Sequence, residues 1–125
     1  GGKCFVARDL ARVGMMMANG GQRQGKQVIP KKWLDDIVQN GDPQAWVEGD
    51  FYDEMGQREM HYRSKWYVMR DSNPLIFGLG IHGQFLFIDP TKHLSIAWFS
   101  SQNNPLNSPT FEKTFETIQK IRDEF

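Results

Sequence analysis

Apolar residues recur every three or four positions through much of the first forty residues, which is the spacing of helices. This pattern predicts a first helix from about Val6 to Ala18, ended by Gly20 and Gly21. It predicts a second helix from Pro30 to Val38, with proline in the first turn. Residues 1–40 are therefore expected to form a helical segment. The apolar positions are Leu10, Val13 and Met17 in the first helix and Trp33, Leu34 and Ile37 in the second.

The helical spacing is lost after residue 40 and a strand pattern follows. Residues 41–60 are acidic, contain scattered glycines and have no clear period, so they are predicted to be a long loop over the body of the protein. Residues 61–101 are predicted to hold three antiparallel strands. The apolar run from Phe85 to Ile88 indicates that the middle strand is buried on both faces. The strands are expected at 61–70, 75–89 and 94–100.

A terminal helix is predicted at 108–125, with Ser108 as its cap and Pro109 in its first turn. A strand buried on both faces needs a layer of structure on each side, as in an α/β/α sandwich. The predicted fold class is therefore α+β, with an antiparallel sheet flanked by helices. Three short helices cover such a sheet only in part, so the domain is expected to be half of a sandwich that lacks neighbouring elements.

Composition narrows the class of protein but does not choose a function. A chain of 125 residues fits one compact domain, and 39% hydrophobic with 24% charged residues is typical of a globular protein. Fifteen basic residues balance fifteen acidic ones, which argues against a nucleic-acid partner. No secretory leader is visible, but one would lie upstream in a longer protein, so the compartment stays open. The single cysteine, Cys4, excludes an internal disulfide and is expected to be a small buried apolar residue.

The chain contains neither a dinucleotide-binding motif in the right context nor a metal-ligand pattern. The segment from Gly78 to Gly83 fits the G-x-G-x-x-G pattern, but that pattern holds a dinucleotide only where it opens a helix, and strand residues follow here. The histidines have no metal-ligand spacing, so neither a metal nor a cofactor is predicted. His61 and His93 are expected at the surface or at strand ends. His82 stands out because it lies between glycines at the beginning of a strand.

No activated nucleophile is present in the chain. Neither a Ser-x-x-Lys nor a Gly-x-Ser-x-Gly motif occurs, so the chain alone cannot carry out covalent acyl transfer. The glycines at 78, 80 and 83 still need an explanation. They could clear side chains from a strand edge so that a reacting carbonyl reaches backbone amides, as an oxyanion hole requires. They could equally mark a bulge that binds nothing, and the residues alone leave both explanations open.

Five segments resemble, in order, motifs of the serine β-lactamase-like (penicillin-binding-protein-like) hydrolases. The most similar branch is that of the 6-aminohexanoate-dimer (nylon-oligomer) hydrolases and related carboxylesterases. The resemblance covers nearly the whole chain, although 41–60 and the last helix match only in type. The segments are Gly1–Gly14 ("GG…ATxRDLARFG"), Asn19–Pro30 ("NGG…G…ximP"), Tyr62–Val68 ("YxxqWWV"), Gly80–Pro90 ("GIHGQxLyvDP") and Leu94–Ser101 ("lvIvxlSS").

This resemblance implies a carboxy-terminal portion of a hydrolase that cleaves an ester or amide through an acyl-enzyme, with its serine, lysine and tyrosine upstream. The strand equivalent to the Lys-Thr-Gly box of β-lactamases would be 78–83, and the backbone N–H of Ile81 would be an oxyanion donor. Gly80, His82 and Gly83 would shape the substrate site beside it. Trp66 or Tyr67 would form a pocket wall, and strand alternation allows only one of them to face it.

Two departures from the family refine this expectation. The Lys-Thr-Gly box itself is absent, which favours esters or linear amides over β-lactams. Val6 stands where the family has a helix-capping threonine, so the first helix should start less stably, by about 1 kcal/mol. The expected partners are a small ester or amide substrate and the missing amino-terminal part of the same protein. Exposed apolar surface also predicts self-association of the chain.

Two other functions remain open on the sequence alone. One is a non-catalytic relative in which the same scaffold serves as a binding or cell-wall-associated module. The other is a structural domain unrelated to hydrolases. An intact Ser-x-x-Lys box upstream would favour the enzyme over the first alternative, and a self-contained fold without an exposed apolar sheet face would favour the second.

Overall fold

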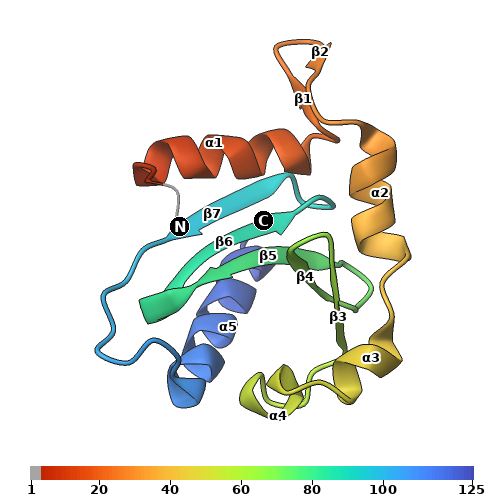
Figure 1. Cartoon of the computed structure of the whole chain (residues 1–125). Coiled ribbons are helices and arrows are strands. Elements are labelled where there is room, and N and C mark those ends of the chain that lie inside the picture. The colour runs from red at the N-terminus through yellow and green to blue at the C-terminus, as the bar shows by residue number, and fades with distance from the viewer. Residues whose placement is uncertain (1–3) are drawn as a thin grey trace.

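The computed structural model of the chain describes residues 4–125 (Figure 1). Gly1, Gly2 and Lys3, which open the first resembling segment, lie outside the described residues. None of the described helices is long and apolar enough to cross a membrane. The elements are α1 (Ala7–Ala18), β1 (Gln22–Arg23), β2 (Lys26–Gln27), α2 (Lys31–Gln39), α3 (Pro43–Val47), α4 (Phe51–Glu54), β3 (Met60–Arg63), β4 (Trp66–Met69), β5 (Leu75–Gly80), a 3₁₀ turn (Ile81–Gly83), β6 (Gln84–Asp89), β7 (Leu94–Trp98) and α5 (Ser108–Asp123).

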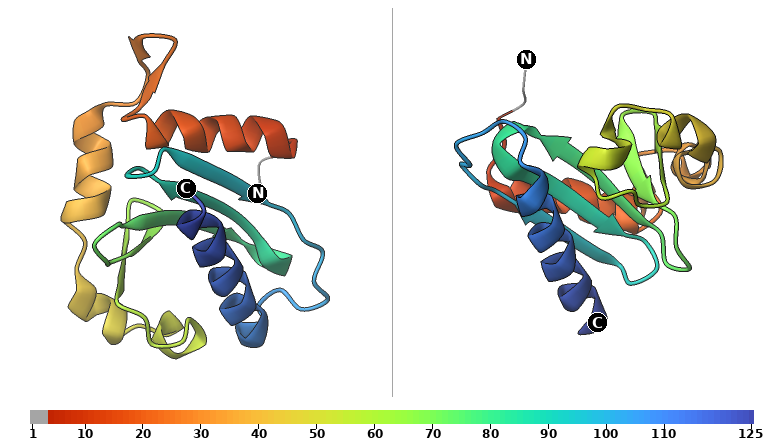
Figure 2. Two further views of the ribbon diagram at one scale, coloured as in Figure 1. Left: turned by 180° about the vertical axis from the view of Figure 1, so that it is seen from behind. Right: turned by 90° about the horizontal axis from the view of Figure 1, so that it is seen from below.

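The main sheet is an antiparallel meander in the order β3-β4-β5-β6-β7. The helix α1 packs on β6 and β7 from one side. Figure 2 shows α5 lying across the opposite face, and the small β1–β2 hairpin projects away from the body in Figure 1. The predicted α+β class, an antiparallel sheet flanked by helices, is confirmed.

Alternation along the strands divides the core into two apolar clusters. Phe77 and Phe87 face α5, where Phe115 packs edge-on against both rings. Ile76 and Leu86 belong to the cluster on the other face, under α1 and α2. This explains the continuous apolar run in β6, because its successive side chains enter different clusters and are all buried.

The sheet has five strands, so the prediction of three was wrong. The expected strand 61–70 folds back at Ser64 and Lys65, whose φ angles are 52° and 74°. The expected strand 75–89 folds back at the Ile81–Gly83 turn. Both turns place non-glycine residues in the left-handed region, which turn-forming sequences usually reserve for Gly, Asn or Asp. Neither reversal was therefore predicted from the residue types.

The segment 41–60 is not a plain loop, as was predicted, but contains α3 and α4. The Asp42 carboxylate caps α3 by accepting hydrogen bonds from two backbone amides. Trp46 and Met55 are buried in the cluster that faces α5, and the Trp46 indole donates to the Arg58 carbonyl oxygen at 3.1 Å. The segment is thus part of the core rather than a cover over it.

The helix starts differ in detail from those predicted. Val6 precedes α1 and forms no side-chain cap, as the sequence indicated. Pro30 lies just before α2 rather than inside it. Asn107, not Ser108, caps α5, since its side-chain oxygen accepts a hydrogen bond from the Thr110 amide at 3.2 Å. The Ser108 hydroxyl instead donates to Glu54 of α4.

Two single-residue predictions were also wrong. His61 is fully buried, whereas a surface or strand-end position was expected. Its Nε2 lies 2.6 Å from the Ile37 carbonyl oxygen, and its Nδ1 lies 2.8 Å from the Arg70 guanidinium. The ring therefore connects β3 to α2, and both of its nitrogens have partners. Cys4 is exposed rather than buried, because it lies before α1 and outside the helix–sheet contact.

Candidate active site

A pocket of about 870 Å³ opens on the face of the sheet that carries α1. α1 covers β6 and β7, and α2 contacts β4, so the end of β5 between them is left open. Among the described residues, no charged side chain lines this pocket. Its walls and floor include Phe5, Leu10, Trp66, Gly78, Gly80 and Phe99.

Gly78 and Gly80 form part of the pocket lining on β5. The pairing of β5 with β6 is uninterrupted from Ile76 to Gly80, so no bulge explains these glycines. A Cβ at Gly78 would stand 3.5 Å from the Trp66 ring, and one at Gly80 would stand 3.4 Å from the Gln84 Cβ. These are close to ordinary contacts. The main effect of the two glycines is to leave the strand surface bare.

The last pair of facing residues in β5 and β6 is Gly80 with Gln84, and Ile81 follows directly after it. Its side chain is 60% exposed, and its carbonyl oxygen accepts a hydrogen bond from the Gln84 side-chain amide at 3.2 Å. Among the described residues, the backbone hydrogen bonds of turns and loops include none donated by the Ile81 amide. Gly80 and Gln84, the residues of that last pair, both line the pocket, whereas Ile81 itself is not among its lining residues, so the Ile81 amide lies next to the pocket lining.

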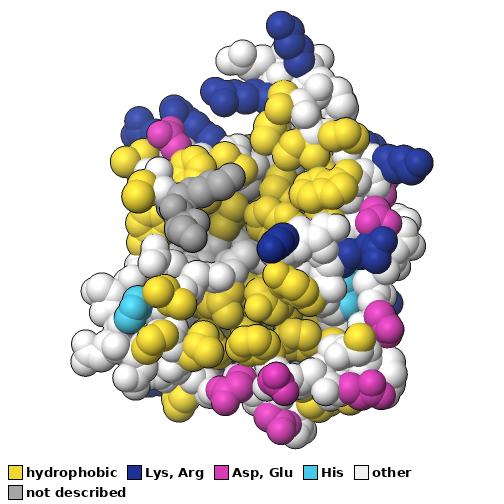
Figure 3. All heavy atoms as spheres, in the orientation of Figure 1, with side chains coloured by type: hydrophobic (Ala, Val, Ile, Leu, Met, Phe, Trp, Pro, Cys, Tyr) yellow, Lys and Arg dark blue, Asp and Glu magenta, His cyan; other side chains and the backbone are white. Residues whose placement is uncertain are grey.

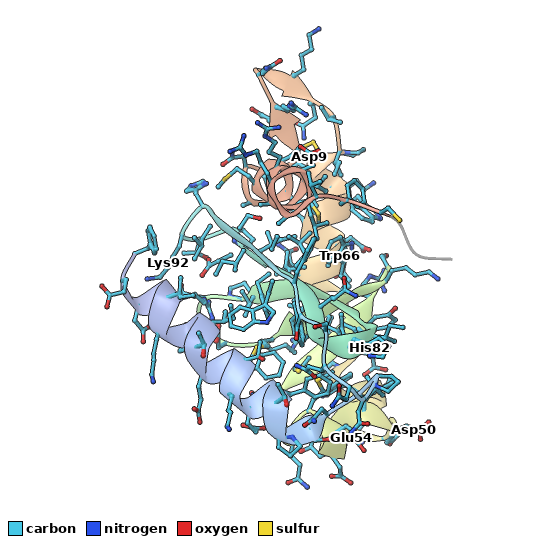
Figure 4. The ribbon with its side chains drawn as sticks, turned by 90° about the vertical axis from the view of Figure 1, so that its left-hand side faces the viewer. Asp9, Asp50, Glu54, Trp66, His82 and Lys92 are labelled. Carbon is cyan, nitrogen blue, oxygen red and sulfur yellow. The ribbon has the colours of Figure 1, made fainter. Side chains whose placement is uncertain are left out.

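His82 and Gly83 complete the turn but do not line the pocket. The His82 Nδ1 lies 2.8 Å from the Gln102 carbonyl oxygen. Gly83 is buried, has a φ of 78° and lies directly against the Gln102 side chain. Figure 4 shows His82 at the end of the strands opposite Lys92, with Trp66 on the α1 side of the sheet. His82 and Gly83 thus contact the 101–107 loop rather than the pocket interior.

Trp66 and Tyr67 lie on opposite faces of the sheet. Trp66 is part of the pocket lining and approaches Gly78. Tyr67 stacks on Phe77 with ring centroids 5.1 Å apart, in the cluster that faces α5. Burial, with a smaller contribution from Tyr62, raises the pKa of Tyr67, so its hydroxyl stays protonated at neutral pH. Of the two aromatic candidates, only Trp66 can contact a molecule in the pocket.

The residues of this region that the sequence analysis did not single out include Phe5, Phe99, Gln102 and Pro105. Phe5 and Phe99 line the pocket, and Gln102 and Pro105 hold the turn. Strand alternation could have placed Phe99 on the same face as Ser95 and Ala97. Gln102 and Pro105 act mainly through backbone atoms in a loop, which leaves no recognisable signal in the sequence.

The front face of the molecule is largely apolar. Figure 3 shows hydrophobic side chains across its middle, with a Lys or Arg side chain among them, and acidic side chains along its lower border. Within residues 4–125, no group of three or more His, Cys, Asp or Glu side chains is arranged to hold a metal ion. The candidate site is therefore an uncharged, largely apolar pocket beside the Ile81–Gly83 turn.

Comparison with known proteins gives this geometry a context. No protein-family model matches the chain. The 6-aminohexanoate-dimer hydrolase of Paenarthrobacter ureafaciens is 34% identical to it over 105 residues, which are 84% of this chain and 26% of that protein. The chain is similar to 6-aminohexanoate-dimer hydrolases. A solved structure from Bacillus anthracis, itself provisionally described as such a hydrolase, superimposes with a TM-score of 0.71 and 27% identity. That match covers 95% of this chain and 29% of the other.

The predicted similarity to the 6-aminohexanoate-dimer hydrolases is confirmed by sequence and by fold. The wider link to serine β-lactamase-like hydrolases rests on the motifs alone. The chain spans only about a quarter of the length of the curated relative that it matches. What the whole relative does is therefore not a property of these residues by themselves.

Proposed function

We propose that this chain is the carboxy-terminal part of a serine hydrolase that cleaves an ester or a linear amide through an acyl-enzyme. In this proposal the remainder of the same protein supplies the serine, and Ile81 supplies one oxyanion donor through its backbone N–H. One observation carries the proposal: the Ile81 amide lies past the end of the strand pairing, next to an open pocket floored by glycine. Similarity to hydrolases over most of the chain supports it.

The proposed chemistry uses the amide where charge develops. The serine hydroxyl gives up its proton as its oxygen bonds to the substrate carbonyl carbon, and the carbonyl oxygen takes up the electron pair of the C=O π bond. The N–H of Ile81 donates a hydrogen bond to that oxygen. A fixed donor stabilises the negative charge best when its nitrogen lies about 2.7–3.1 Å from the oxygen in a site shielded from water. The amine or alcohol then leaves with a proton, and water releases the acid from the serine in a second step. Upstream lysine and tyrosine side chains would move these protons.

The pocket lining supports an uncharged linear acyl group rather than a β-lactam. Trp66, Leu10 and Phe99 offer apolar walls, and none of the described pocket residues carries a charge that would bind a carboxylate. The absence of a Lys-Thr-Gly box points the same way.

The test is a chimera in which this chain replaces the matching segment of the Paenarthrobacter ureafaciens hydrolase. A cooperative thermal transition first establishes that the chimera is folded. We expect it to hydrolyse short nitrophenyl acyl esters and linear amides and to gain the mass of an acyl group on its serine. A folded chimera that never acylates this serine would contradict the proposal and favour a binding module.

The Ile81→Pro variant removes the proposed donor itself. Gly80 has φ −106° and ψ 160°, an extended conformation that a following proline tolerates. We expect kcat to fall by about 10²–10³-fold, with little change in KM. The matched control is Lys31→Pro at the first residue of α2, where Pro30 is also extended and the N–H is not needed by the helix. The donor role is wrong if Ile81→Pro behaves like this control.

A further inference from the structure

The turn that carries Ile81 is tied to the 101–107 loop by three hydrogen bonds, all of which use His82. The His82 amide donates to the Pro105 carbonyl oxygen at 2.9 Å, and the Gln102 amide donates to the His82 carbonyl oxygen at 3.1 Å. The third joins the His82 ring to the Gln102 carbonyl oxygen at 2.8 Å. We call this set of contacts the His82 clamp. It joins two segments that lie about twenty residues apart in the chain.

The backbone of His82 is in an unusual conformation. Its φ of 62° and ψ of 26° lie in the left-handed region, which residues other than glycine seldom adopt. Such a conformation persists where surrounding contacts hold it in place. Gly83 follows with a φ of 78° and leaves no room for a side chain against Gln102. Together the two residues allow the turn to lie directly on the loop.

The ring of His82 has a fixed direction and a fixed proton. A carbonyl oxygen only accepts hydrogen bonds, so the nitrogen that faces the Gln102 carbonyl, Nδ1, carries a hydrogen. A ring held in this way is not free to turn toward the pocket. The His82 amide belongs to the peptide group that joins Ile81 to His82, so the clamp holds that peptide group in place, and the Ile81 N–H lies one Cα before it.

We propose that His82 is a positioning residue that holds the Ile81 N–H toward the pocket, rather than a residue that contacts substrate. The inference rests on the proposed oxyanion role of Ile81 and deepens it. A donor displaced by about 1 Å can cost 10²-fold in rate. The side chain of His82 therefore controls the transition state through the neighbouring amide.

Two variants separate the ring from the backbone conformation. His82→Gly keeps the left-handed backbone but removes the ring donor. His82→Asn keeps both, since asparagine tolerates this conformation and its side-chain amide donates hydrogen bonds. The matched control is His93→Gly. His93 also has a positive φ of 51° and an Nδ1 contact, to Asn19 at 3.2 Å, but it lies beyond the other end of β6.

Steady-state kinetics in the chimera measures the effect. We expect His82→Gly to lower kcat by about 10–100-fold with KM changed less than about twofold, because the oxyanion contact is strongest in the transition state. His82→Asn should recover most of kcat, and His93→Gly should match the parent. An active chimera in which His82→Gly is no slower than His93→Gly overturns the inference and leaves the proposed function intact.

A measurement on the 125-residue chain alone keeps the two ideas apart. Nitrogen-15 spectra at neutral pH should show the His82 ring proton on Nδ1. Hydrogen exchange at the Gln102 amide should speed up in His82→Gly and not in His93→Gly. A proton on Nε2, or unchanged exchange, overturns the clamp whatever the chimera does. An inactive chimera together with a proton on Nδ1 and faster exchange rejects the oxyanion proposal and leaves the clamp as a feature of the fold.

Discussion

The Arg122 guanidinium in the last turn of α5 lies 2.7 Å from the Asp89 carboxylate at the end of β6, and both side chains are buried. The other carboxylate oxygen of Asp89 accepts a hydrogen bond from the Lys92 backbone amide at 2.9 Å. Arg122 also donates to Gln119 at 3.1 Å and to the carbonyl oxygen of Asn73. This network fastens the end of α5 to the turns at one end of the sheet.

Replacing Arg122 with methionine is expected to destabilise the chain by about 3–5 kcal/mol, because it leaves a buried carboxylate without its partner. Urea unfolding followed by circular dichroism measures this difference. Arg12→Ala is the control, since it breaks an exposed ion pair with Asp9 at 3.0 Å and should cost less than about 1 kcal/mol. Equal losses in the two variants would mean that the buried pair has no special role.

The buried imidazole of His61 makes stability depend on pH. Burial lowers the pKa of His61 below its ordinary value of 6.5, and the charge of Arg70 adds to this effect. The unfolded chain therefore takes up a proton as the pH falls through 6.5, whereas the folded chain resists it. Stability is fully present above that value and falls as the pH drops toward the lowered folded pKa, by at most about 1.4 kcal/mol per pH unit.

Unfolding midpoints measured between pH 7 and pH 5 test this expectation. His61→Gln should be less stable at pH 7 but show a flatter dependence, while His93→Gln at an exposed position should keep the original slope. A hydrogen bond from Arg63 lowers the pKa of Asp36 below 3.8, and one from Arg58 lowers the pKa of Glu112 below 4.5. These two carboxylates therefore make stability depend on pH only at lower pH than His61 does. An unchanged slope in His61→Gln contradicts the prediction.

The uncovered apolar surface should make the isolated chain associate with itself. Phe99 is 47% exposed beside the pocket, and β7 is the last strand of the sheet, with one edge unpaired among the described residues. Sedimentation velocity should show oligomers that grow with concentration. Phe99→Asp should reduce them, whereas Phe125→Asp at the 75% exposed carboxy-terminal residue should not. A parent chain that sediments as a monomer at every concentration rules this out.

The periodic parts of the fold were predictable because burial on one helix face or both strand faces leaves a regular pattern of apolar residues. The reversals at 64–65 and 81–83 were not, since local contacts there impose left-handed angles on serine, lysine and histidine. The burial of His61 was missed for a related reason. Its partner Ile37 lies 24 residues away and contributes only a carbonyl oxygen, which any residue would offer.

Some features of the candidate site could likewise be predicted from the sequence, and others could not. The glycines at 78, 80 and 83 indicated a strand without side chains on its surface, whereas Ile81 came only from the resemblance to a known family. The sequence also required Trp66 and Tyr67 to lie on opposite faces, although it could not say which one faces the pocket. The contact of His82 with Gln102 and Pro105 was out of reach, since it depends on how a loop closes over the turn.

The bare floor of the pocket has a consequence for how this scaffold could change. The backbone of Gly80 is ordinarily extended and a methyl group at Gly78 or Gly80 would meet neighbours at 3.4–3.5 Å, so neither position depends on glycine for its shape. A larger side chain at either position would make the pocket shallower, while the backbone at Ile81 stays in place. If the proposed function holds, substitutions at Gly78 or Gly80 would change which acyl groups fit the pocket without changing the backbone that carries the proposed donor.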